Sequence, residues 1–236
     1  KMNLMKLNVV KEDLDQQTIN NMKLHILTYS TDTNNEILKK SSSTLGTELL
    51  PVLIQWTQDF YAKSYSVYEA VKKLEDEDLV LVYDAYDVLP INEATNKKLL
   101  DKITESFDLD KITFNAEKNC YPINELAQLY PNTSSPWKFL NAGLYVGKVK
   151  KVKVLLEKAL PLIKESKMDQ AAFSLMFVEG KHDIALDYEC KVFQTLYMLS
   201  LGDLTIKNKE IINNIFNTKP LLIHGNGRSG IEFFKH

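Results

Sequence analysis

Residues 78–90 read DLVLVYDAYDVLP, an apolar run that ends at two acidic residues three positions apart, Asp84 and Asp87. A short continuous apolar run is typical of a strand that is buried on both faces. Because Asp is common in turns, one interpretation is that the two aspartates only end this strand. The other is that both carboxylates lie beyond the carboxyl end of the strand, where open α/β sheets bind ligands and hard oxygen ligands suit a divalent cation.

Residues 219–227, KPLLIHGNG, repeat this order with an apolar run, His224 and a glycine-rich loop. Glycine lets backbone N–H groups approach an anion closely, and imidazole suits Mn²⁺ better than Mg²⁺. The two strand ends together therefore predict one site for a metal ion and a diphosphate.

Length and composition favour a single α/β domain. The chain has 236 residues, of which 44% are apolar, and this is enough to bury a full core. We expect residues 1–21 to be an N-terminal extension without chemistry and residues 22–236 to form the domain. The net charge of −2 argues against a nucleic-acid partner.

The sequence predicts no membrane span. No apolar segment approaches the length that crosses a bilayer, and the first residues lack a signal-peptide core. The compartment stays open between the endoplasmic reticulum lumen and a viral or host-cytoplasmic setting. Cys120 and Cys190 are the only cysteines, and either one disulfide or two free thiols fits the sequence.

Six motifs in a fixed order resemble the glycosyltransferase domain of the procollagen lysyl hydroxylase (PLOD) family. They are YDAYDV at 83–88, NAE with CYP at 115–122, FLNAG at 139–143, MDQ at 168–170, VFQTL at 192–196 and HGNG at 224–227. The resemblance covers roughly residues 23–230 and implies a GT-A fold, a Rossmann-like mixed sheet flanked by helices. The chain leaves no room for the family's iron-dependent hydroxylase domain, so it resembles a stand-alone transferase module.

The resemblance implies a metal and a donor nucleotide at the strand ends. Asp84, Asp87 and His224 would hold Mn²⁺, with Mg²⁺ as the alternative, and the donor would be a UDP-sugar. Tyr86 would stack on the uracil. Thr28, at the end of the first predicted strand, would help to hold the nucleoside, although a purely structural Thr is the competing interpretation.

The diphosphate would lie at the glycine-rich loop. Its candidate contacts are Gly225, Asn226, Gly227 and Arg228. The family typically has Pro, a small hydroxyl residue and Lys after this loop, so Arg228 would replace the missing cation. Lys63 matches a basic family position that could meet a phosphate, but a solvated surface lysine is the interpretation we favour.

Two residues are candidates for contact with the sugar or the acceptor. Asn141 lies in the NAG segment, where the family more usually has Ser in place of Ala142. Asp169 is what remains of a longer acidic run in the family, and it could bind sugar hydroxyls or assist proton transfer. At a helix start it could equally be a simple cap. Glu117, also at a predicted strand end, could line the same pocket.

The expected function is metal-dependent transfer of a hexose, glucose or galactose, from a UDP-sugar. The acceptor would be hydroxylysine or galactosyl-hydroxylysine on a collagen-like protein. One alternative is a metal-dependent phosphoryl hydrolase, but no second metal cluster or P-loop is evident. Another is a catalytically degenerate UDP-sugar or collagen-binding module, suggested by Ala142, the shortened acidic run and Gly230.

Periodicity and turn residues predict the remaining elements. We expect strands at 24–30, 49–55, 111–117, 139–147 and 184–187, and helices ending near 45 and spanning 92–107, 150–165 and 168–177. We expect a kink at Asn141-Ala142-Gly143, because small residues let another group approach the backbone. Residues 119–136 should form a loop, and residues 202–218 a peripheral strand and helix.

Overall fold

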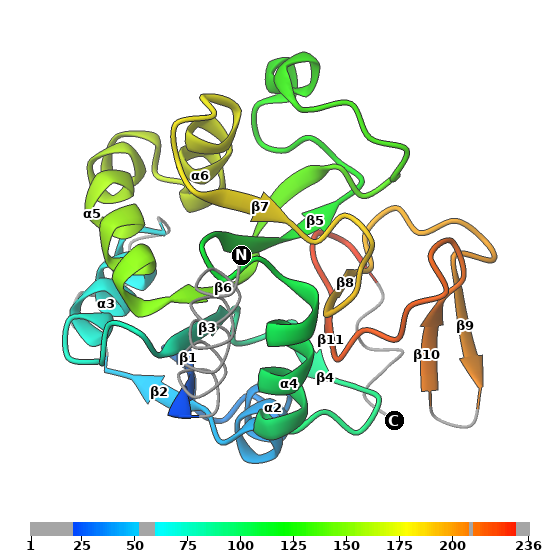
Figure 1. Cartoon of the computed structure of the whole chain (residues 1–236), viewed down its shortest axis with the longest axis horizontal. Helices are drawn as coiled ribbons and strands as arrows, with labels where there is room; N and C mark the ends of the chain where they lie inside the picture. The colour runs from blue at the N-terminus through cyan, green and yellow to red at the C-terminus, as the bar shows by residue number, and fades with distance from the viewer. Residues whose placement is uncertain (1–20, 52–59, 208–209, 230–236) are drawn as a thin grey trace, which may run out of the picture.

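A six-stranded mixed sheet is the centre of the computed structural model, which describes residues 21–51, 60–207 and 210–229 (Figure 1). Its strands, in spatial order, are β2 (Glu48–Leu50), β1 (Leu24–Tyr29), β3 (Leu79–Tyr83), β6 (Phe139–Lys148), β5 (Ile112–Glu117) and β7 (Ile184–Leu186). Neighbouring pairs are parallel except that β6 runs antiparallel to both β3 and β5. The predicted mixed α/β sheet is confirmed.

Strand β3 is buried on both faces, as its continuous apolar run predicted. Val80 and Val82 face one hydrophobic cluster, whereas Leu79, Leu81 and Tyr83 face another. None of the five residues is more than 2% exposed. Burying each such side chain contributes about 1.5–3 kcal/mol relative to exposure, so the strand that carries the acidic turn is held firmly.

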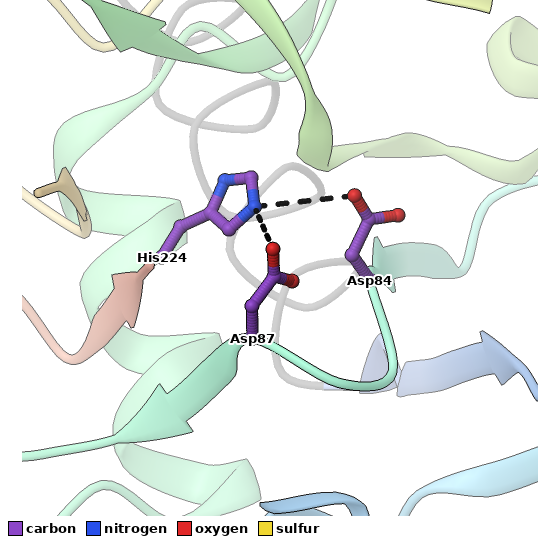
Figure 2. Close-up of side chains that lie close together, drawn as sticks. All are labelled: Asp84, Asp87 and His224. Atoms are coloured by element: carbon purple, nitrogen blue, oxygen red, sulfur yellow. Dashed lines mark ion pairs between the residues drawn. The ribbon is translucent and has the colours of Figure 1, made fainter. Parts of the chain in front are cut away.

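A small three-stranded sheet brings the two predicted strand ends together. Its strands are β4 (Val88–Pro90), β11 (Leu222–His224) and β8 (Phe193–Thr195), with β11 in the middle. β11 runs antiparallel to β4, and His224 lies opposite Val88, the residue that follows Asp87. This pairing places the imidazole beside the acidic turn (Figure 2).

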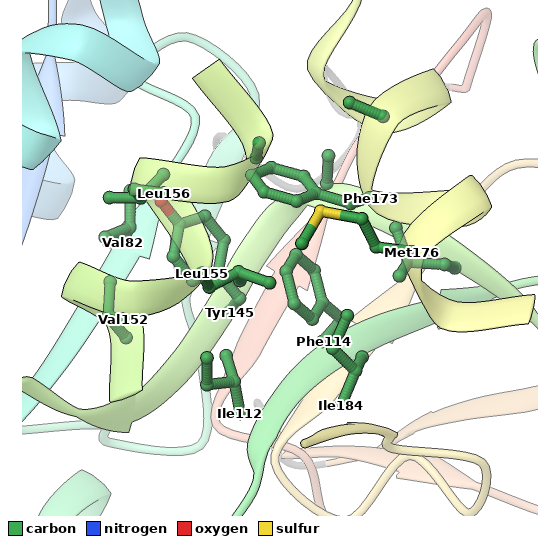
Figure 3. Close-up of a cluster of buried hydrophobic side chains, with 14 of the residues drawn as sticks. Val82, Ile112, Phe114, Tyr145, Val152, Leu155, Leu156, Phe173, Met176 and Ile184 are labelled. Carbon is green, nitrogen blue, oxygen red and sulfur yellow. The ribbon is translucent and has the colours of Figure 1, made fainter. Parts of the chain in front are cut away.

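Helices cover both faces of the large sheet (Figure 1). α3 (Tyr61–Val71), α5 (Val149–Ser166) and α6 (Asp169–Val178) share one core cluster with β3 and β5, and α4 (Asn96–Ser106) packs into the other. α2 (Glu36–Leu45) packs beside β4. In the first cluster the ring of Phe114 lies 4.9 Å from that of Tyr145 and 5.1 Å from that of Phe173, measured between centroids (Figure 3). Such aromatic contacts join β5, β6 and α6 into one unit.

Strand β6 carries the predicted kink. Phe114 of β5 lies opposite Tyr145, but the next residue, Asn115, lies opposite Asn141, so residues 142–144 have no partner on β5. A bulge bends its strand and re-aims the neighbouring side chains. At this bulge the Gly143 carbonyl accepts from the Asp84 N–H at 2.9 Å, which ties β6 to the acidic turn.

Several predicted boundaries were wrong. The helix expected at 92–107 begins at Asn96, because Asn92 and Glu93 have positive φ values of 52° and 55° and the Thr95 side chain caps the helix. The helix expected within 202–218 is not there among the described residues, where β9 (Leu204–Lys207) and β10 (Glu210–Asn213) form a hairpin. The loop at 119–136 contains a 3₁₀ turn, η1 (Asn124–Leu129).

Parts of other predictions fall outside the described residues. The second strand is described only as Glu48–Leu50, and residues 52–55 of the expected strand lie outside. The same holds for residues 1–20 of the expected extension and for Gly230.

Cys120 and Cys190 are both free thiols. None of the helices in the described ranges is both long and apolar enough to cross a membrane.

Candidate active site

Asp84, Asp87 and His224 converge as the sequence predicted (Figure 2). The Nε2 atom of His224 lies 3.3 Å from Asp87 Oδ2 and 3.9 Å from Asp84 Oδ2. One ligand atom from each of the three residues lies within 4.8 Å of the others. Two carboxylate oxygens and one imidazole nitrogen are a donor set that fits Mn²⁺, and Mg²⁺ less well because of the imidazole.

The backbone fixes the histidine in this position. The Gly225 N–H donates to the Asp87 carbonyl at 2.7 Å, which joins the two strand ends directly. On the other side, a Cβ atom at Gly143 would lie 2.1 Å from Cε1 of His224, so only glycine is tolerated there. The close approach expected at the NAG segment is therefore that of the imidazole.

Neighbouring opposite charges shift the pKa values of His224 and Asp84 toward their charged forms. Burial lowers the pKa of His224, but the carboxylates of Asp87 and Asp84 outweigh this effect and the net pKa is raised. Burial likewise raises the pKa of Asp84, but Lys63 and His224 outweigh it and the net pKa is lowered. Asp84 is thus an anion at neutral pH, which is the form that binds a metal ion. A metal ion that binds Nε2 of His224 must first displace a proton from that nitrogen.

Lys63 is not the surface lysine that we favoured from the sequence. It is 7% exposed, and its Nζ lies 2.8 Å from Asp84 Oδ1 and 2.5 Å from Asp169 Oδ2. Burial lowers its pKa, but the two carboxylates outweigh this and the net pKa is raised. The charge of Lys63 is therefore engaged between two carboxylates within the chain.

Asp169 is more than a helix cap. The capping position of α6 is Met168, whose side chain makes no cap hydrogen bond. Asp169 follows it, and its Oδ1 accepts from the Gln170 N–H at 2.8 Å while Oδ2 pairs with Lys63. Burial raises the pKa of Asp169, against the lowering effect of Lys63.

Glu117 is the centre of a buried amide network. Its Oε1 accepts from Asn141 Nδ2 at 3.0 Å and from Gln170 Nε2 at 2.8 Å, and its Oε2 accepts from Asn226 Nδ2 at 2.9 Å. Burial raises the pKa of Glu117, and the three amide donors oppose that rise without cancelling it. Sequence reasoning missed Gln170, although it belongs to the MDQ motif that drew attention to Asp169.

Two cavities meet at the acidic turn. One of about 370 Å³ is lined by Glu117, Asn141, Asp169, His224 and Arg228, among others, and one of about 310 Å³ by Tyr29, Thr31, Lys63 and Tyr86. Asp84 and Asp87 line both cavities. A cation bound by the two aspartates would therefore face both cavities.

Tyr86 presents its ring to the smaller cavity in a fixed orientation. Its hydroxyl oxygen accepts from the N–H groups of Thr31 and Asp32, each at 2.9 Å, and lies 2.9 Å from Ser30 Oγ. The residue is 39% exposed. A flat, half-open ring that is anchored at its far end can stack on a planar base.

Thr28 does not line either cavity, contrary to our expectation. It is fully buried, and its Oγ1 donates to the Tyr83 carbonyl at 2.7 Å. This hydrogen bond joins β1 to the last carbonyl of β3, so the Thr28 hydroxyl is already used within the sheet.

The glycine-rich loop offers fewer free donors than expected. The Gly225 N–H is occupied by Asp87, and the Asn226 side chain is occupied by Glu117 and by the N–H groups of Leu196 and Tyr197. Gly227 adopts a positive φ of 61° against the ring of Tyr197. Gly227 and the exposed Arg228 line the larger cavity and remain candidates for contact with an anion.

Comparison with known proteins shows the family to which this chain belongs. Residues 63–235 match the family model described as PLOD GT domain. An uncharacterized protein, R699, of Acanthamoeba polyphaga mimivirus is 30% identical over 67% of this chain and 33% of its own length. A multifunctional procollagen lysine hydroxylase and glycosyltransferase of Caenorhabditis elegans is 30% identical over 67% of this chain and 23% of its own length.

A solved structure shares the fold. A glycosyltransferase involved in the glycosylation of the major capsid of PBCV-1 superimposes with a TM-score of 0.56 at 15% sequence identity, covering 89% of this chain and 96% of that one. This similarity confirms the predicted glycosyltransferase fold. The matched regions span only about a quarter to a third of the two curated relatives.

Proposed function

The chain belongs to the PLOD GT domain family, and from this premise we propose that it is a metal-dependent hexosyltransferase. The donor would be a UDP-sugar, UDP-glucose or UDP-galactose, and the acceptor a hydroxylysine or galactosyl-hydroxylysine on a collagen-like protein. The observation that carries the proposal is the convergence of Asp84, Asp87 and His224 where two cavities meet.

The smaller cavity suits the nucleoside. Tyr86 would stack on the uracil with a ring that its hydroxyl anchors to the turn at 30–32. The diphosphate would then reach the acidic turn, where Asp84, Asp87 and His224 would hold Mn²⁺. When bound, this ion neutralises the charge that develops on the leaving diphosphate. Gly227 and Arg228 would contact the phosphates from the larger cavity.

The larger cavity suits the sugar and the acceptor. Asn141 and Asp169 line it, and their side chains can form hydrogen bonds with sugar hydroxyls. Glu117 lines it as well, but its carboxylate oxygens already accept from amides within the chain. Asn141 is held in place by donation to Glu117 and by acceptance from the Gly143 N–H at 2.9 Å. The Lys63 contact holds the Asp169 carboxylate at the cavity wall, where it can orient an acceptor hydroxyl.

The test is release of UDP from a panel of UDP-sugars with Mn²⁺, with and without a galactosyl-hydroxylysine peptide. We expect release that the peptide stimulates, loss of release when Mn²⁺ is chelated, and loss in Asp87→Ala with the fold intact. Asp101→Ala is the matched control, since Asp101 is half-exposed on α4 and, within the described ranges, its side chain pairs only with Lys97. UDP binding without release from any donor would instead favour the degenerate binding module.

A further inference from the structure

Asn115 is a buried amide in contact with the imidazole of the candidate metal site. It lies in β5, is 0% exposed, and its Nδ2 is 3.5 Å from Nδ1 of His224. Its Oδ1 has no hydrogen-bond partner among the described residues. Buried carbonyl oxygens are rarely left unpaired, because the lost hydration is not replaced, so this atom calls for an explanation.

The two nitrogens of His224 face different surroundings. Nε2 faces Asp87 and Asp84, at 3.3 Å and 3.9 Å, whereas Nδ1 faces Asn115. A neutral imidazole carries its proton on one nitrogen and a lone pair on the other. If Nε2 gives its lone pair to a metal ion, Nδ1 must carry the proton and needs a hydrogen-bond acceptor.

Only one polar side chain in the described part of the chain lies within hydrogen-bond distance of Nδ1. His224 is 2% exposed, and its ring lies against the backbone of Gly143. Asn115 is therefore the group that can take the Nδ1 proton. The two ends of a side-chain amide are nearly equal in size, so a half-turn about the Cβ–Cγ bond exchanges them and brings Oδ1 to Nδ1.

We propose that Asn115 is a positioning residue for the metal site: its side-chain oxygen accepts the Nδ1 proton of His224 and directs the Nε2 lone pair toward a divalent cation between Asp84 and Asp87. This inference rests on the metal site of the proposed function. When the imidazole is neutral and no cation is bound, Asn115 Nδ2 donates to Nδ1 and the Nε2 proton faces Asp87. An amide supports both tautomers, because it carries a donor and an acceptor at one position.

The first test compares Mn²⁺ affinity by isothermal titration in two variants of similar size. Asn115→Leu removes both polar ends, whereas Asn115→Asp keeps the acceptor. We expect Asn115→Leu to lose roughly 10–100-fold in affinity, the usual effect of losing an outer-shell partner of a ligating histidine, and Asn115→Asp to retain its affinity within a few-fold. Equal affinities for wild type and Asn115→Leu would overturn the proposal.

A control separates this effect from loss of stability. Asn213→Leu removes another fully buried amide, one that donates to Gln194 Oε1 at 2.8 Å and lies outside both cavities. We expect it to lower the melting temperature without changing Mn²⁺ affinity. A loss of affinity equal to that of Asn115→Leu would show that general destabilisation is the cause, and the proposal would fall.

The second test observes the tautomer directly. The chain is labelled with ¹⁵N-histidine, His224 is assigned with His224→Asn, and spectra are recorded at a pH where the imidazole is neutral, with Zn²⁺ as a diamagnetic probe. We expect the proton of His224 on Nδ1 when Zn²⁺ is bound; a proton that stays on Nε2 contradicts the proposal.

The outcomes also separate this inference from the proposed function. If wild type binds Mn²⁺ and Asn115→Leu binds it equally well, the inference about Asn115 fails alone. If wild type binds Mn²⁺ and shows the expected tautomer but never releases UDP, the proposed function fails and the positioning role stands. If wild type binds no Mn²⁺, both fail.

Discussion

Carboxylate side chains lie at the ends of two strands of the large sheet, and they differ in their exposure and in their hydrogen-bond partners. Glu117 at the end of β5 is 3% exposed and accepts from three side-chain amides. The side chains of Asp84 and Asp87, after β3, are 29% and 34% exposed and face an imidazole. Both oxygens of Glu117 are hydrogen-bonded within the chain, so this carboxylate is part of the framework although it lines a cavity. Asp84 pairs with Lys63 through Oδ1 only, and its Oδ2, like Oδ2 of Asp87, is available to a ligand.

Lys63 pairs with the half-open Asp84 and with the buried Asp169. Because one substitution removes both ion pairs, we expect it to cause the largest change in stability. Lys63→Met leaves Asp84 and the buried Asp169 without their cation. Because breaking a buried ion pair leaves an uncompensated charge, we expect a loss of about 3–5 kcal/mol in the free energy of unfolding, measured by urea denaturation. Lys63→Met combined with Asp169→Asn should recover part of this loss. If Lys63→Met alone were as stable as wild type, the ion pairs of Lys63 would not contribute to stability.

Glu117→Gln tests the amide network at the end of β5, and we expect a smaller loss of stability than for Lys63→Met. One of the three amide donors would then face another amide N–H₂ instead of a carboxylate oxygen. We expect a loss of about 1–3 kcal/mol in unfolding free energy, the cost of an unsatisfied buried polar group. The melting temperature of the variant, compared with that of Asp101→Ala, measures this. No loss would mean that the amide network adds nothing to the fold.

The two strand ends should also differ in their pH dependence. The pKa of Glu117 is raised from 4.5, so its favourable contribution is present below pH 4.5 and is lost as pH rises through the folded value. The pKa of Asp84 is lowered from 3.8, so its contribution is present above pH 3.8 and is lost as pH falls through the folded value. In urea titrations of the metal-free chain across this range, Glu117→Gln should remove the first dependence and leave the second. If Glu117→Gln instead removed the loss of stability at low pH and kept the loss at higher pH, the assignment of these two dependences to Glu117 and Asp84 would be wrong.

The smallest effect is expected at Tyr86. Tyr86→Phe keeps the ring but removes the oxygen that holds it to the turn at 30–32. We expect UDP affinity to fall by a few-fold, equivalent to about 0.5–1.5 kcal/mol for the lost anchoring. Isothermal titration with UDP measures it. A loss as large as that of Tyr86→Ala would mean that the hydroxyl, and not the ring, contacts the nucleotide.

The open end was predictable from the sequence, and the framework end was mostly not. A continuous apolar run identified β3, and the acidic turn and the His-Gly-Asn-Gly loop identified the three candidate ligands, because these signals are local. The burial of Lys63 depends on carboxylates 21 and 106 positions away in sequence. Lysine is rarely buried, so only the folded arrangement of α3, β3 and α6 reveals it.

Other misses have the same cause. Gln170 and Asn115 act through contacts with Glu117 and His224 on other elements, which no local pattern encodes. Thr28 was expected to contact a nucleotide because the end of the first strand contributes to the nucleotide pocket in the family that the sequence resembles, but its hydroxyl donates to the neighbouring strand. The hairpin of β9 and β10 was missed at 202–218, where pairing between the two segments decides the structure.

The most direct measurement is the Mn²⁺ affinity of wild type, Asp87→Asn and Glu117→Gln by isothermal titration. We expect one Mn²⁺ per chain in wild type and an affinity within about tenfold of it in Glu117→Gln. Asp87→Asn should lose more than about 100-fold, because it removes a ligand and outer-shell changes alone cost roughly 10–100-fold. Equal affinities for wild type and Asp87→Asn, or a greater loss in Glu117→Gln, would contradict the division between an open ligand end and a closed framework end.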